Sequence, residues 1–119
     1  MRWNQKQVDD YLNRGKEDEP ESVLQKKITQ WARDRGYPCL SFRQSKKAQG
    51  FLAPGWPDLT IALDKGRTIY IELKRQKGGY LSAKQIEKAL MFGQLGHEWY
   101  QVKTWKRFME IIEEEKRIR

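Results

Sequence analysis

Apolar residues that recur every three or four positions after Pro20 predict a helix with one buried face. Proline suits a first helical turn, and Asp18 or Glu19 could cap it. Gly36 is a natural terminator, since glycine readily adopts the left-handed conformation at a helix end. The residues expected to face the core are Leu24, Ile28, Trp31 and Ala32.

The same spacing predicts three more helices. Ser82 is expected to cap one that runs to about residue 95, where Gly96 would stop it. Thr104 opens the last helix, and a short one is predicted over 4–13. The residues expected to point inward are Ile86, Ala89, Leu90 and Gly93 in the helix after Ser82, and Trp105, Phe108, Ile111 and Ile112 in the last.

Strict alternation of apolar and polar residues over 58–63 and 68–74 predicts a β-hairpin. All large aliphatic side chains fall on one face only if a three-residue loop joins the strands, with its glycine in the left-handed conformation. That register places Leu59 opposite Ile71 and, one step further, Asp58 opposite Glu72.

The order of the predicted elements indicates an α/β fold. Further strands are expected over 39–44 and 98–102, which gives the order helix, strand, strand, strand, helix, strand, helix after the polar segment 14–20. A small mixed sheet flanked by helices is the expected architecture. Residues 1–19 are interpreted as an N-terminal extension with a short helix, and 20–119 as the domain.

Composition excludes several classes of protein. The 119 residues are 38% hydrophobic and 34% charged, enough apolar material for one folded domain. One cysteine and one histidine rule out an internal disulfide and a zinc site of thiolates and imidazoles, but oxygen ligands remain possible. The chain has no apolar stretch long enough for a membrane span and no apolar signal-peptide core, so a cytoplasmic location is expected.

Positive charge is concentrated in the middle of the chain. Residues 43–88 hold 10 basic and 4 acidic side chains, so this segment contributes 10 − 4 = +6 of the net +8. Such a field favours a polyanionic partner, with nucleic acid the first class to consider. A merely solubilising surface is the alternative.

The hairpin register brings together residues that could perform chemistry. Asp58 and Glu72 would be cross-strand neighbours, with Lys74 two residues further along the same face. Two adjacent carboxylates repel unless a cation lies between them, and oxygen ligands suit Mg²⁺ or Mn²⁺. A lysine beside such a cation could orient or deprotonate a water molecule, which suits metal-assisted phosphodiester hydrolysis.

Each of these residues also has a structural interpretation. Asp58 could be a turn residue, and Glu72 and Lys74 could lie on a solvated sheet face. Trp56 could stack on a base or pack beneath its loop.

The motifs resemble a known family. PD (57–58) and ELK (72–74) are similar to the PD-(D/E)xK nuclease superfamily, and more closely to the virus-type replication-repair nuclease (VRR-Nuc) domain. The resemblance covers about residues 20–112 and also includes ESVLQ (21–25), GWPDL (55–59) and LSAKQ (81–85). It implies a restriction-endonuclease-like αβββαβ core, Mg²⁺- or Mn²⁺-dependent DNA cleavage, and in standalone members a homodimer that acts on branched or Holliday-junction DNA.

The resemblance also implies roles for individual residues. Asp58, Glu72 and the backbone carbonyl of Leu73 would hold the metal, and Lys74 would position the attacking water. Glu21 would be a further ligand or a neighbour of the metal, although a first-turn acid is its structural alternative. Gln25 and Gln85 would shape the site, and Ser82 with Gln85 also fits a capping box.

The partner expected from these motifs is DNA, with no membrane and no small-molecule cofactor. The rival hypotheses are a non-catalytic nucleic-acid-binding module and a restriction-type or single-strand nuclease. Each basic residue could also be an idle surface charge. The candidates for phosphate contact are Lys46, Lys47, Arg75, Lys77, Lys84 and Lys88.

Overall fold

The computed structural model describes residues 2, 4–6, 20–42 and 54–118. Residues 5 and 6 are helical and residue 4 is not. The remaining part of the helix predicted over 4–13, most of the linker, and both Lys46 and Lys47 lie outside the described residues. The elements after residue 20 follow the predicted order. They are α2 (Glu21–Asp34), β1 (Cys39–Ser41), β2 (Leu59–Ala62), the 3-10 turn η2 (Asp64–Gly66), β3 (Thr68–Leu73), α3 (Ala83–Gln94), β4 (Glu98–Val102) and α4 (Trp105–Ile118).

The four strands form one mixed sheet in the order β1-β2-β3-β4. The first two pairs are antiparallel, and β3 runs parallel to β4. Leu59 lies opposite Ile71, which confirms the predicted hairpin register. The loop has the predicted length, but Lys65 adopts a left-handed conformation (φ 59°) as well as Gly66 (φ 75°), which the sequence did not indicate.

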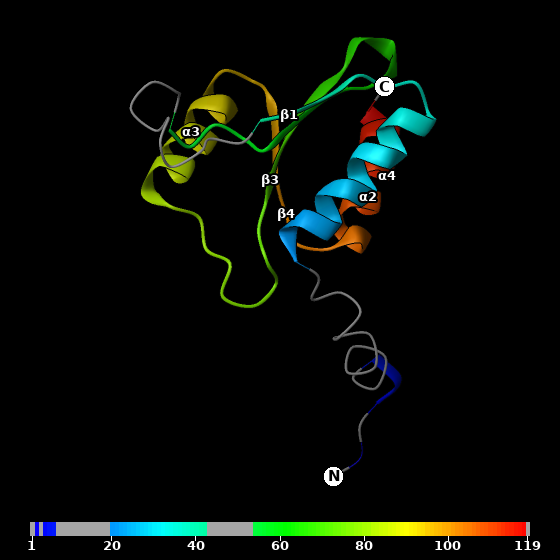
Figure 1. The fold of residues 1–119 in the computed structure, drawn as a ribbon, viewed down its shortest axis with the longest axis vertical. Helices are drawn as coiled ribbons and strands as arrows, with labels where there is room; N and C mark the ends of the chain where they lie inside the picture. The colour runs from blue at the N-terminus through cyan, green and yellow to red at the C-terminus, as the bar shows by residue number, and fades with distance from the viewer. Residues whose placement is uncertain (1, 3, 7–19, 43–53, 119) are drawn as a thin grey trace.

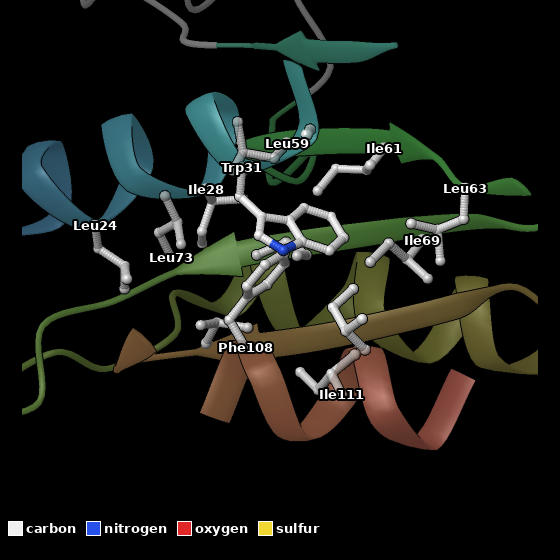
Figure 2. Close-up of a cluster of buried hydrophobic side chains, with 14 residues drawn as sticks. Leu24, Ile28, Trp31, Leu59, Ile61, Leu63, Ile69, Leu73, Phe108 and Ile111 are labelled. Carbon is white, nitrogen blue, oxygen red and sulfur yellow. The ribbon is translucent and has the colours of Figure 1, made fainter. Parts of the chain in front are cut away.

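Helices cover both faces of the sheet. Figure 1 shows α2 and α4 side by side on one face and α3 on the other. The aliphatic face of the hairpin packs against α2 and α4, and Figure 2 shows the side chains of these helices converging on the strands. Trp31 of α2 meets Phe108 of α4 edge to face, with ring centroids 5.1 Å apart. The buried cluster includes Leu24, Ile28, Trp31, Ala32, Leu59, Ile61, Leu63, Ile69, Ile71, Leu73, Val102, Phe108, Ile111 and Ile112.

The predicted inward face of α3 is wrong. Ile86 and Leu90 are 47% and 63% exposed, Gly93 is exposed and Ala89 only half-buried, whereas Phe92 is the buried residue of this helix. The reason lies in the sheet face that α3 covers, which presents aromatic and polar side chains rather than aliphatic ones. Phe92 packs there against Tyr70, 4.8 Å between ring centroids, so α3 needs only one large apolar contact instead of a stripe.

Two helix starts differ in how they are capped. Pro20 is the N-cap residue of α2 and offers no side-chain cap, while Asp18 and Glu19, the expected caps, lie outside the described residues. Ser82 caps α3 in a full capping box with Gln85, as its sequence predicted. Gly36 follows α2 with φ 75°, the left-handed conformation expected of a terminator.

A buried ionic cluster fastens α4 to the sheet. Glu115 is fully buried, and Arg67, which precedes β3, donates to its Oε2 from Nε at 2.6 Å. The Tyr100 hydroxyl of β4 donates to Glu115 Oε1 at 2.5 Å. Burial and the Glu115 carboxylate raise the pKa of Tyr100 well above its usual value, so this hydroxyl stays a donor. In the part of the chain described, no helix is long and apolar enough to cross a bilayer.

Candidate active site

Asp58 and Glu72 lie next to each other at one end of the hairpin, where β2 begins and β3 ends. Asp58 directly precedes β2, and the observed register puts it one step beyond the Leu59–Ile71 pair, opposite Glu72. The backbone N–H of Leu73 donates to Asp58 Oδ2 at 2.8 Å, which fixes this carboxylate against the end of β3. The two acids therefore share one face, as the sequence predicted.

Glu72 is a buried carboxylate whose hydrogen bonds are incomplete. It is 1% exposed, its Oε1 accepts a hydrogen bond from Gln85 Nε2, and its Oε2 has no partner in the described chain. Burial raises the pKa of Glu72 to about 8, and the negative charge of Asp58 acts in the same direction. A buried acid with one unpartnered oxygen is costly for a fold, so Oε2 of Glu72 indicates a place for a ligand.

Lys74 supplies the positive charge of the site. It follows β3 directly, and its backbone N–H donates to the carbonyl of Val102 at 3.1 Å, which continues the pairing with β4. The side chain is half-buried, and its charge lowers the pKa of Glu72, although by less than burial raises it. The three predicted residues Asp58, Glu72 and Lys74 are thus brought together on one face.

Gln85 makes the predicted capping box and also contacts Glu72. Its backbone N–H and side-chain carbonyl complete the capping box with Ser82, while its side-chain amide donates to Glu72. The start of α3 is held near Asp58 by Gly55, where a Cβ atom would lie 2.3 Å from the carbonyl oxygen of Lys84. Gly55 also has φ 80°, so glycine is required there on two grounds. The GWPDL motif alone does not reveal this role of Gly55.

The first turns of α2 border the site from the other side. Glu21 is half-buried, and its charge is one of those that raise the pKa of Glu72. Gln25, one turn later, donates from Nε2 to Ser41 Oγ of β1. Gln25 therefore ties α2 to β1 at this edge of the sheet.

The donor set fits a divalent cation held by few protein ligands. Within 20–42 and 54–118, no three His, Cys, Asp or Glu side chains lie close enough together to hold a metal ion by themselves. Mg²⁺ commonly uses only one or two carboxylates, with water and substrate phosphate as its other ligands. The unpartnered Oε2 of Glu72 beside Asp58 suits that mode, because a cation would relieve both the missing contact and the repulsion between the two acids.

The sequence matches no protein-family model and no curated protein. Two solved structures are similar to the chain. One, described as "VRR_NUC domain", aligns with 78% of this chain and 94% of its own, at a TM-score of 0.61 and 22% identity. The other, a "VRR_NUC domain protein", covers 79% of this chain and 85% of its own, at 0.59 and 21%. The chain has the VRR_NUC fold. The predicted α/β architecture is thereby confirmed.

Exposed basic side chains lie on the loop that follows β3 and Lys74. Arg75 and Lys77 are exposed in this loop, and Gly79 packs so tightly on Arg75 that a Cβ there would lie 2.2 Å from its carbonyl oxygen. On α3, Lys84 is exposed with Glu87 3.6 Å away, and Lys88 is half-buried. Trp56 packs edge to face on Phe92, at 5.2 Å between centroids, which favours the packing interpretation for this residue.

Proposed function

We propose that this chain is a divalent-metal-dependent endodeoxyribonuclease of the VRR-Nuc type, within the PD-(D/E)xK superfamily. The observation that carries the proposal is Glu72, a buried carboxylate with an unpartnered oxygen, in register with Asp58 and beside Lys74. The fold shared with the VRR_NUC structures supports it. The proposed substrate is the phosphodiester bond of DNA, with a preference for branched or junction forms.

Mg²⁺ or Mn²⁺ would be held by Asp58 and Glu72, with the carbonyl of Leu73 and Glu21 as further candidates. When bound, the cation supplies a polarised phosphate oxygen and an activated water. Lys74 orients that water and stabilises the charge that develops on the phosphate. Gln85 keeps Glu72 directed into the site, and the Leu73 N–H does the same for Asp58.

A nucleic-acid-binding module without catalysis is the rival. The basic loop after β3 would suit such a module. A buried, incompletely bonded Glu72 would not, because adjacent carboxylates repel the phosphates that the lysines attract. A chelator-sensitive nicking assay separates the two functions.

The decisive experiment compares linear, flap and four-way-junction DNA with Mg²⁺, with Mn²⁺ and with chelator. Asp58→Ala and Lys74→Ala are expected to lower cleavage by about a thousandfold or more, because each removes a group that acts on the reacting phosphate. Lys65→Ala, at the exposed hairpin turn, is the matched control for loss of one positive charge. Cleavage by Lys74→Ala at the rate of the unaltered protein would overturn the proposal, and cleavage of linear DNA alone would replace junction selectivity by a restriction-type or single-strand activity.

A four-way junction needs two incisions, so we also propose a homodimer with one site in each copy. Light scattering after size-exclusion chromatography is expected to give twice the 14.3 kDa chain mass. A mass of one chain, with junction DNA still cleaved in pairs, would contradict this part.

A further inference from the structure

A groove of about 630 Å³ lies between the outer side of α2 and the first turn of α4, away from the acidic pair. α2 supplies one wall and Trp105, the first residue of α4, contributes to the other. The two helices lie side by side on one face of the sheet (Figure 1). The lining residues are Lys26, Lys27, Gln30, Trp31, Asp34, Arg35 and Trp105.

The groove is basic and its charged groups are oriented. It holds three cationic side chains against one acid, and Asp34 Oδ1 accepts a hydrogen bond from Gln30 Nε2 at 2.7 Å. The guanidinium of Arg35 lies 4.5 Å from the centroid of the Trp31 ring and donates to the Trp31 carbonyl at 3.3 Å. Trp105 contributes an aromatic side chain to the second wall, so the positive charge of the groove comes from α2 and Arg35. A polyanion is the complementary ligand.

The lining of the groove starts at Lys26 and follows α2 away from the end of this helix that borders the candidate active site. α2 starts at Glu21, next to the acidic pair, and α4 follows β4, whose last residue pairs with Leu73. With a helix rise of about 1.5 Å per residue, Lys26 lies about 8 Å along α2 from Glu21, and Arg35 about 21 Å. At about 3.4 Å per nucleotide of duplex, this stretch matches about two to six nucleotides.

We infer that this groove binds the sugar–phosphate backbone of the DNA that flanks the cleaved bond, with Lys26 and Lys27 as phosphate contacts. The inference rests on the proposed function and extends it to a second contact surface, on the opposite sheet face from the basic loop and α3. The short distance along α2 between the acidic pair and Lys26 favours nucleic acid over an acidic protein, since one strand of a few nucleotides can reach both places. The indole of Trp105 supplies an apolar surface for deoxyribose, opposite the cationic side chains of α2.

The test measures binding without a divalent cation, so that cleavage does not enter. Labelled junctions with arms of about two base pairs, each closed by a hairpin loop so that it stays paired, and with arms of about ten base pairs are titrated by fluorescence anisotropy over a range of salt concentrations. The double variant K26E/K27E is compared with K65E/R117E, which reverses two exposed charges at the hairpin turn and in the last turn of α4. Each variant changes the net charge from +8 to 8 − 4 = +4.

Three results are expected. The unaltered protein binds the long-armed junction more tightly than the short one, K26E/K27E loses most of that gain, and K65E/R117E keeps it. The salt dependence of K26E/K27E on the long arms is expected to flatten by about two units in log–log slope, one for each lost phosphate contact.

Other outcomes would contradict DNA binding by the groove and leave the proposed nuclease activity unaffected. Equal loss in both double variants would mean that only net charge matters. If the unaltered protein binds long-armed and short-armed junctions with the same affinity, DNA does not enter the groove. The same follows if K26E/K27E binds the long-armed junction as tightly as the unaltered protein does. Conversely, weaker binding by K26E/K27E in a protein that never cleaves DNA would support DNA binding by the groove and overturn the nuclease.

Discussion

Burial of a charged residue has different meanings for two glutamates in this chain. Glu115 is fully buried and has both oxygens engaged, by Arg67 on one side and Tyr100 on the other. Glu72 is 1% exposed and lacks a partner for Oε2, while Asp58 repels it. A buried carboxylate that stabilises the fold is expected to have partners for both oxygens. A buried carboxylate that binds a ligand is expected to leave an oxygen without a partner in the chain.

Neutralising each glutamate should therefore have opposite effects. Glu72→Gln is expected to abolish Mg²⁺-dependent nicking while leaving the free energy of unfolding unchanged or higher, because it removes a buried acid whose ionisation the fold disfavours. Glu115→Gln is expected to retain nicking but lose about 1–3 kcal/mol of stability, since Arg67 keeps its charge without its partner. Urea denaturation and a nicking assay on both variants measure the four values.

Each variant is the control for the other, because both make the same chemical change at a buried site. A Glu72→Gln protein that unfolds readily would mean that this carboxylate is structural. Loss of nicking in folded Glu115→Gln would mean that the ionic cluster acts on the site.

Among the elements, the hairpin was predictable and the packing of α3 was not. Period-two alternation leaves only one register that keeps the aliphatic residues together, so the Leu59–Ile71 pair and the neighbouring acids followed from the sequence. The apolar pattern of α3 suggested Leu90, but what a helix buries depends on the surface opposite, which one segment does not reveal. Gln85 was recognised as a candidate, whereas its contact with Glu72 required the spatial position of α3. The Lys26–Lys27 pair could not be identified from the sequence, because the groove that it lines is formed only when α2 and α4 pack together.

The corrected orientation of α3 makes a prediction that contradicts the sequence pattern. Phe92→Ala is expected to lower the free energy of unfolding by about 3 kcal/mol, because Phe92 fills the space between Trp56 and Tyr70. Leu90→Ala, at a position 63% exposed, is expected to change it by less than about 0.5 kcal/mol. Urea denaturation of the two variants measures both, and a larger loss from Leu90→Ala would restore the orientation predicted from sequence.

Over the whole molecule, the acidic pair of the candidate active site is separate from the ionic cluster that attaches α4 to the sheet. The acidic pair lies at the edge of the sheet where β3 ends and where α2 and α4 begin. The ionic cluster around Glu115 instead joins the residue before β3 to the later part of α4. Substitutions at the acidic pair should consequently leave the cluster in place, and a bound cation should stabilise the chain through mass action alone.

That separation allows metal binding to be measured without cleavage. In about 10 mM Mg²⁺, at about ten times an assumed dissociation constant, the folded state should gain about 1.4 kcal/mol, a rise of about 5 °C in melting temperature. Asp58→Asn and Glu72→Gln are expected to lose this rise, because each removes a ligand. Lys74→Ala should keep it although cleavage is lost, because the lysine acts on water and phosphate rather than on the cation. NaCl at matched ionic strength is the control, and a rise retained in Asp58→Asn or absent in the unaltered protein would show that the acidic pair does not hold the metal.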